Sequence, residues 1–204
     1  LPISLTKAEA AYAELTKDLP EGLPFTDVSG HWGLTAIQYV YEHGLMDGVE
    51  HQKFEPNGTL NRAMLITILY RQEGEPTVNG DDLFSDVPAD AWYTKAVIWG
   101  SSNGIINGLG DNKFAPMENI TREEMAAMLY RYAEYKGYDT SKRNDLTKYT
   151  DAGAISSWAL EAVQWANAEA LLNGSTATTI LPSGTATRAE AATMLMRFAE
   201  NVVL

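Results

Sequence analysis

Apolar and polar residues follow one another along much of the chain with the spacing of amphipathic helices. The clearest run places four apolar side chains at i, i+3, i+4 and i+7, on one face of a helix: Met125, Met128, Leu129 and Tyr132. Thr121 precedes this run, and Glu124 lies three residues after Thr121, as in a capping box at a helix N-terminus. The pattern therefore predicts a helix that begins just after Thr121.

The residues of this helix start recur in the chain. Thr187-Arg188-Ala189-Glu190 repeats the motif Thr121-Arg122-Glu123-Glu124 closely, and Asn61-Arg62-Ala63-Met64 repeats it more loosely. An arginine in the first helical turn opposes the macrodipole and costs roughly 0.3–1 kcal/mol. A single copy would be explained by a neighbouring glutamate, but three copies in register favour an anionic ligand. Guanidinium matches a carboxylate with two parallel hydrogen bonds, and we expect helix-start amides to add further donors.

Each arginine belongs to a longer block with fixed internal spacing. The blocks open at Phe25-Thr26-Asp27-Val28, Phe84-Ser85-Asp86-Val87 and Tyr149-Thr150-Asp151-Ala152. In all three, 16 residues separate a Trp from a Gly and 14 separate that Gly from the arginine: Trp32, Gly48 and Arg62; Trp92, Gly108 and Arg122; Trp158, Gly174 and Arg188. Such self-similarity indicates repeated units that share a core.

Each block has the pattern helix, loop, helix. We expect three repeats, at 24–76, 83–138 and 148–204, in one compact all-α bundle with a pseudo-threefold arrangement, because one helix pair cannot bury its apolar face alone. Residues 1–19 resemble the second half of a block, with Lys7 in the place of the arginine. We interpret them as an extra N-terminal helix docked on the bundle; an ordinary polar helix that matches by accident is the alternative.

Charge and composition narrow the possible partners. The formal net charge of −12 argues against nucleic acid and against polybasic attachment to anionic lipid. No apolar run approaches the ~18 residues of a membrane span, so we expect no membrane insertion. The chain has no cysteine, hence no disulfide and no cysteine-based metal site. It opens at Leu1 without a leader-like segment, and we expect any signal peptide to lie outside it.

Candidates for catalysis or metal binding are few. His31, His43 and His51 all lie in the first block without metal-ligand spacing, so we expect no metal site. The adjacent carboxylates of Glu123 and Glu124 suggest glycosidase chemistry, but Glu124 is already assigned to the helix cap. The sequence shows no nucleophile–base constellation, phosphate loop or cofactor fingerprint. We therefore expect neither enzyme activity nor a cofactor.

The order of landmarks, from Phe-x-Asp-Val through Trp, Gly and Phe-x-Pro to Thr-Arg-Ala-Glu, resembles the S-layer homology (SLH) repeat. The resemblance covers residues 25–200, in three tandem copies. It implies a non-catalytic, extracellular module that fixes a surface protein to the bacterial cell wall. The implied partner is an acidic secondary cell wall polysaccharide carrying pyruvylated N-acetylmannosamine, and the implied passenger domain lies outside this chain. We expect a monomer; a structural repeat for protein–protein contact or self-assembly in a surface layer is the alternative.

The resemblance also implies ligand grooves between adjacent repeats. Carried over to this chain, their residues are Arg62, Arg122, Arg188, Asp27, Asp86, Asp151, Trp32, Trp92, Trp158, Gly48, Gly108 and Gly174. A purely structural role stays open for most of them: the tryptophans could be core residues, the aspartates could cap their own turns, and the glycines could supply positive φ. We expect Arg122→Ala to weaken binding of the polysaccharide while thermal stability changes little.

Two blocks depart from the pattern. Block one has Asn61 for the threonine and Met64 for the glutamate, so its helix loses the capping box but keeps a good N-cap. Block three has Ala170 where the others have Gly44 and Gly104, and its loop lacks the phenylalanine before x-Pro. We therefore expect that a weak groove, if there is one, is lined by the third block.

Overall fold

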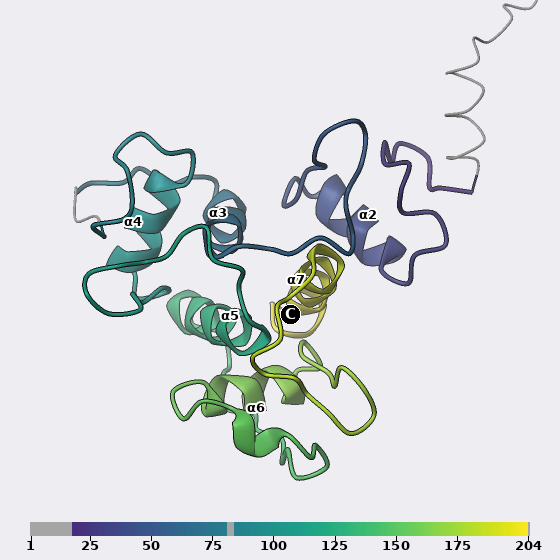
Figure 1. Ribbon diagram of the computed structural model, residues 1–204. Helices are drawn as coiled ribbons and strands as arrows, with labels where there is room; N and C mark the ends of the chain where they lie inside the picture. The colour runs from purple at the N-terminus through teal and green to yellow at the C-terminus, as the bar shows by residue number, and fades with distance from the viewer. Residues whose placement is uncertain (1–17, 81–83, 204) are drawn as a thin grey trace, which may run out of the picture.

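The computed structural model describes residues 18–80 and 84–203 of the chain (Figure 1). Within these ranges it has six α-helices, one short 3₁₀-helix and no strand longer than an isolated bridge, which confirms the predicted all-α fold. The helices are α2 (Leu34–Glu42), α3 (Arg62–Gln72), α4 (Thr94–Ser102), α5 (Arg122–Lys136), η1 (Ala152–Ala154), α6 (Leu160–Ala168) and α7 (Arg188–Asn201). The predicted helix at residues 1–19, with its Lys7, lies outside the described residues apart from its last two positions.

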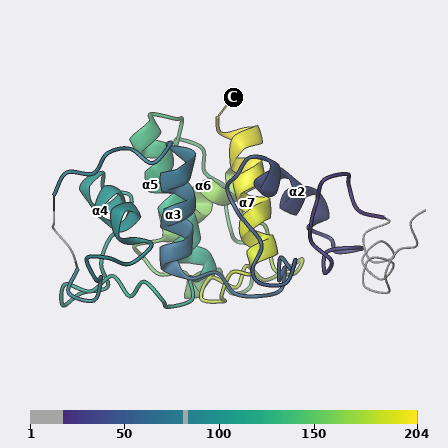
Figure 2. The same cartoon turned by 90° about the horizontal axis from the view of Figure 1, so that it is seen from above.

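The α-helices form three pairs around a common centre (Figure 1). The first helix of a repeat packs against the second helix of the preceding repeat, so that α4 contacts α3 and α6 contacts α5. The remaining pair joins α2, near the start of the described chain, to α7 at its end. This last contact closes the three repeats into a ring, in which α3, α5 and α7 lie innermost (Figures 1 and 2).

Backbone hydrogen bonds join all three repeats close to the centre. The amide of Leu60 donates to the carbonyl of Ala186 at 3.1 Å, and the amide of Ala186 donates to the carbonyl of Ile120 at 2.9 Å. The amide of Ile120 returns to the carbonyl of Leu60 at 2.9 Å and completes a cycle. Each of these buried residues lies two positions before a motif arginine. The cycle therefore fixes the three helix starts relative to one another.

The innermost helices begin as the sequence predicts. Thr121 and Thr187 form complete capping boxes with Glu124 and Glu190 at the starts of α5 and α7. Asn61 caps α3 without a box, its side-chain oxygen accepting from the amide of Met64 at 2.8 Å. The prediction for all three helix starts is confirmed.

The core contains the aromatic residues of the loops between the helices as well as helical side chains. Phe54 and Phe114, two residues before a proline in their loops, are fully buried, and Ile180 is buried at the same position of the third repeat. These side chains anchor the loops that run beside the motif arginines. The core therefore extends directly beneath the candidate site.

Candidate functional site

Three grooves open beside the motif arginines, which begin α3, α5 and α7 and which we call the inner arginines. The Arg62 groove is lined by Arg62, Asn107, Gly108, Glu124, Arg131 and Trp158. The Arg122 groove is lined by Arg122, Asn173, Gly174, Glu190, Arg197 and Trp32. The Arg188 groove is lined by Arg188, Asp47, Gly48, Met64, Arg71 and Trp92. Their volumes are about 320, 190 and 270 Å³, respectively.

Every groove takes residues from all three repeats. The Arg62 groove has its inner arginine from the first repeat, Glu124 from the second and Trp158 from the third. The other two grooves follow the same order, each shifted by one repeat. Because the third repeat lines all three grooves, its departures from the motif do not single out one of them as weak.

The inner arginines are buried and bind backbone carbonyls of the next repeat around the ring. Nε of Arg62 donates to the carbonyl of Phe114 at 2.8 Å, and Nη2 donates to the carbonyl of Asn107 at 3.1 Å. The equivalent acceptors are Ile180 and Asn173 for Arg122, and Phe54 and Asp47 for Arg188. A guanidinium held in this way cross-links two repeats, so the inner arginine positions the groove as well as lining it.

A carboxylate completes the surroundings of two of these arginines. Glu124 accepts from Nη1 of Arg62 at 2.7 Å, and Glu190 accepts from Nη1 of Arg122 at 2.5 Å. The same two glutamates form the capping boxes of α5 and α7. Arg188 faces Met64 at this position, and none of the described carboxylates pairs with it.

The motif aspartates hold the loop whose carbonyl receives the inner arginine. Both carboxylate oxygens of Asp86 accept backbone amides, from Phe114 at 2.9 Å and Ala115 at 2.8 Å. Burial alone would raise the pKa of Asp86, but these hydrogen bonds bring the pKa below its ordinary value. Asp27 and Asp151 accept the equivalent pairs of amides in their own repeats. The aspartates therefore fix the loop that receives the inner arginine.

The groove glycines are required by close packing, and the suggestion that they supply positive φ is wrong. Gly48, Gly108 and Gly174 all have φ outside the left-handed region. A Cβ atom at Gly108 would lie 2.7 Å from the carbonyl oxygen of Lys113 and 2.8 Å from the ring of Phe84. The other two glycines have equivalent neighbours. The loop can therefore approach the aromatic ring only without a side chain at this position.

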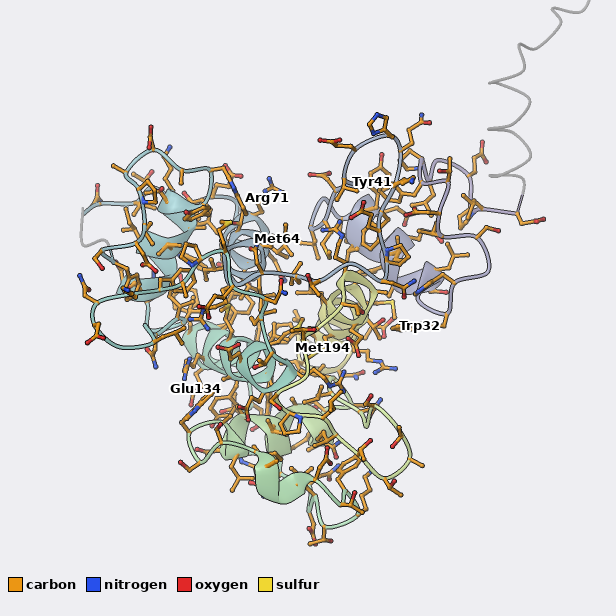
Figure 3. All side chains as sticks on the ribbon, viewed as in Figure 1. Trp32, Tyr41, Met64, Arg71, Glu134 and Met194 are labelled. Carbon is orange, nitrogen blue, oxygen red and sulfur yellow. The ribbon has the colours of Figure 1, made fainter. Side chains whose placement is uncertain are left out.

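The motif tryptophans are exposed, and the suggestion that they are core residues is wrong. Trp32, Trp92 and Trp158 have exposed fractions of 65, 59 and 54%. Each lies just before the first helix of its repeat and lines a groove whose inner arginine belongs to another repeat. Figure 3 shows Trp32 beside α7, where it lines the Arg122 groove. The buried tryptophans are instead Trp99 and Trp165, within α4 and α6.

The helix-start amides are already occupied, which corrects the expectation that they donate to a ligand. At α5 the amides of Arg122 and Glu123 donate to the carbonyls of Gly184 and Pro182, and the next amide donates to Thr121. The starts of α3 and α7 show the same arrangement. The backbone of these helix starts is used to join repeats, which leaves side chains to recognise an anion.

The same three blocks that build the grooves match a known family profile. Residues 24–63, 83–126 and 148–192 each match the S-layer homology domain. The chain belongs to the S-layer homology domain family.

Similar proteins carry this SLH module within much longer chains. The module is 33% identical over 181 residues to a Surface-layer 125 kDa protein of Lysinibacillus sphaericus, covering 87% of this chain and 15% of the relative. It is 32% identical over 186 residues to an endoglucanase of Bacillus sp. (strain KSM-635), covering 91% and 20%. It is 28% identical over 145 residues to a cellulosome-anchoring protein of Acetivibrio thermocellus, covering 64% and 32%. The chain thus spans less than a third of the length of each.

A second set of arginines in the SLH module lies outside the site that the sequence predicts. Arg71, Arg131 and Arg197 each lie nine residues after an inner arginine and line the same grooves; we call them the outer arginines. Their fixed spacing is visible in the sequence, but the short motif points only to the helix start. Arg131 forms no hydrogen bond or ion pair within the described residues. Burial lowers the pKa of Arg131, and the nearby positive charge of Arg62 lowers it further.

The described part of the SLH module contains no other site of obvious chemistry. It has no group of three or more His, Cys, Asp or Glu residues arranged to hold a metal ion. His31 contacts Asn57, and His43 stacks on Tyr39. None of its described helices combines the length and the apolar character needed to cross a bilayer.

Proposed function

We propose that this SLH module anchors a surface protein to the bacterial cell wall by holding an acidic wall polysaccharide in its grooves. The observation that carries the proposal is the threefold recurrence of one cleft with an exposed tryptophan, an inner arginine and an outer arginine. Three such clefts on one module allow several units of a repeating polymer to bind together, which strengthens attachment through effective concentration.

The tryptophans supply the surface for a sugar ring. A tryptophan side chain exposed by more than half leaves a large apolar surface in water, and such surfaces mark interaction sites when they adjoin a pocket. The apolar face of a pyranose ring stacks on such a surface, while its hydroxyl groups reach the polar loop beside Gly48, Gly108 or Gly174.

The arginines supply selectivity for an anion. A ketal-linked pyruvate carries a planar carboxylate, which guanidinium binds through two parallel hydrogen bonds. In the Arg62 groove, Arg131 is unpaired within the described residues and its charge is opposed by that of Arg62. A carboxylate bound beside Arg131 would relieve this repulsion. The groove therefore favours an anionic sugar, such as pyruvylated N-acetylmannosamine, over a neutral one.

The relatives support a role as an anchor fused to other domains. A surface-layer protein, an endoglucanase and a cellulosome-anchoring protein each contain a segment similar to this module, which covers 15, 20 and 32% of their lengths. A segment common to proteins with such different names supports attachment as its role, and not one of their individual activities. The module accordingly catalyses nothing, acts outside the cell and carries a passenger domain.

Sedimentation with protein-free cell-wall sacculi tests the anchoring function. We expect the module to pellet with sacculi that carry the pyruvylated polymer and to stay in solution when the pyruvate has been removed. Failure to pellet with intact sacculi, together with binding to cell-surface protein, would favour the alternative of protein–protein contact. Release of reducing ends from the polymer would instead indicate an enzyme.

Substitution of an outer arginine tests the site itself. Arg131→Ala should weaken binding of the purified polymer by about tenfold or more, because one charge-assisted hydrogen bond contributes about 1.5–3 kcal/mol. Thermal stability should change little, because Arg131 bonds to none of the described residues. Lys95→Ala, which removes an exposed cation outside the grooves, is the matched control. Equal affinity of the two variants would exclude Arg131 from the site.

A further inference from the structure

The three grooves place their carboxylate at two different positions. In the Arg62 and Arg122 grooves the carboxylate comes from the helix, as Glu124 and Glu190, and the residue before the groove glycine is an asparagine. In the Arg188 groove the helix position holds Met64, and the residue before the glycine is Asp47. The Arg188 groove therefore carries its negative charge on the loop, whereas the other two grooves carry it on the helix.

This difference reverses which arginine is paired. In the Arg62 and Arg122 grooves the inner arginine has its carboxylate, while Arg131 has no described partner and Arg197 donates only to the carbonyl of Ala170 at 3.2 Å. In the Arg188 groove the outer arginine is paired instead, with Nη1 of Arg71 lying 3.5 Å from Asp47. Figure 3 shows Met64 and Arg71 on the side of α3 that faces α2 and the loops around it.

The inner arginine of the Arg188 groove has one side-chain nitrogen that forms no hydrogen bond within the described residues. Nε and Nη2 of Arg188 donate to the carbonyls of Phe54 and Asp47, both at 2.7 Å, but Nη1 has no partner within the described residues. This nitrogen is not among the fully enclosed polar atoms that lack a partner, and Arg188 lines the groove. Nη1 is therefore accessible from the groove.

We propose that the grooves receive the anionic group at two depths. In the Arg188 groove the anion enters deeply and binds Nη1 of Arg188. In the other two grooves it stays near the surface and binds the outer arginines, Arg131 and Arg197. This inference rests on the proposed function, since it assumes that the grooves hold an anionic sugar.

Nearby negative charges do not block the deep position. The charges of Glu55, Asp27 and Asp47 all act on Arg188, but none of these side chains hydrogen-bonds to it. Both oxygens of Asp27 accept backbone amides, Glu55 is exposed, and the carboxylate of Asp47 lies beside Arg71. The Nη1 edge of Arg188 therefore has no carboxylate partner within the described residues. In the other two grooves, Glu124 and Glu190 occupy the equivalent edge of the inner arginine.

The test introduces into the Arg188 groove the helix carboxylate that the other two grooves have. Met64→Glu copies the residue that the other repeats have beside their inner arginine, and Met64→Gln provides the same shape without the charge. The probe is a pyruvylated N-acetylmannosamine glycoside, with its methyl ester as the uncharged counterpart. Each groove contains one exposed tryptophan, so nuclear magnetic resonance of the indole N–H groups follows each groove separately, with Trp92 reporting on this one.

Met64→Glu should weaken binding at Trp92 by tenfold or more and leave Trp32 and Trp158 unchanged. Met64→Gln should change binding at Trp92 by less than about threefold, and the unfolding midpoints of both variants should stay close to that of the parent protein. Equal behaviour of the Glu and Gln variants would overturn the inference. If the parent protein binds the glycoside and its ester equally, or binds neither, the proposed function itself fails.

Discussion

Ala170 occupies a backbone conformation that the other two repeats give to glycine. Its φ is 57°, and the equivalent Gly44 and Gly104 have φ of 65° and 69°. A residue with a Cβ atom is disfavoured in this left-handed region by roughly 1–2 kcal/mol. The third repeat therefore carries a local strain that can be removed without changing a contact.

We predict that Ala170→Gly stabilises the module by about 0.5–1 kcal/mol. The relief of strain outweighs the greater freedom of glycine in the unfolded chain, which costs roughly 0.4–1 kcal/mol. Urea unfolding measures the difference. Gly104→Ala is the reciprocal control, because a Cβ atom there meets no neighbour within 4 Å and the substitution adds only backbone strain. A loss of stability in Ala170→Gly would show that the strain is absent.

Arg122 is a structural residue as much as a candidate ligand. Its guanidinium donates to the carbonyls of Ile180 and Asn173 and to the carboxylate of Glu190. We predict that Arg122→Ala lowers the free energy of unfolding by about 2 kcal/mol or more, because it leaves buried acceptors without donors. This replaces the expectation of little change in stability. Thermal unfolding checks it, with Arg131→Ala as the control; equal midpoints would contradict it.

Single residues were predictable where their partners lie nearby in the sequence. The cap of Thr121 by Glu124 spans three residues, and both the motif and the geometry agree. The partner of Asp151 lies 29 residues away at Ile180, and that of Arg122 lies 58 residues away, so no local pattern identifies either. The exposure of the tryptophans escaped prediction for the same reason, since it depends on the packing of another repeat.

At the scale of elements, each loop before an inner helix is held between two charged side chains. In the third repeat Asp151 accepts the amides of Ile180 and Leu181, both at 2.8 Å, and the carbonyl of Ile180 accepts from Arg122 at 3.0 Å. Leu181 has a φ of 53°, a strained conformation that these bonds maintain. The loop is thereby shaped from one side by an anion and from the other by a cation.

The two hydrogen bonds that Asp151 accepts from the loop, which we call the Asp151 clamp, should make the stability of the module depend on pH. Hydrogen bonds from the amides of Ile180 and Leu181 lower the pKa of Asp151 in the folded protein. Its contribution is therefore present above the unfolded pKa of about 3.9 and is lost as the pH falls through the lower folded value. We predict that Asp151→Asn is less stable than the parent at pH 7 and that the two converge toward pH 3.

Urea midpoints measured between pH 3 and 7 check this convergence. Asp145→Asn offers a control, since Asp145 is exposed and accepts only the amide of Thr147, two residues away. A constant difference between Asp151→Asn and the parent over the whole range would mean that the carboxylate charge has no part in the clamp.

The helical elements were predictable from periodicity, but their packing partners were not. The apolar spacing places Met128 and Leu129 on a buried face of α5, as observed. The same spacing cannot say that α5 packs against α6 of the following repeat, because an apolar stripe fits any helix of suitable shape. Threefold repetition indicated a closed arrangement, and the contact of α2 with α7 is what achieves it.

At the scale of the whole molecule, the repeats depend on one another. Each first helix packs on a neighbour's second helix, each inner arginine bonds to a neighbour's loop, and each groove draws on all three repeats. The cycle of hydrogen bonds through Leu60, Ala186 and Ile120 cannot form with one repeat missing. A repeat is therefore a unit of sequence and not a unit of folding.

This dependence predicts a single cooperative unfolding transition for the whole module. The calorimetric and van't Hoff enthalpies should agree, as they do for a two-state domain. A fragment of residues 24–138 should show no cooperative transition. It lacks α6 and α7, which cover α5 and α2, and it leaves the guanidinium of Arg122 without its three acceptors. Separate transitions in the module, or cooperative unfolding of the fragment, would mean that the contacts between repeats are weaker than their burial and hydrogen bonding imply.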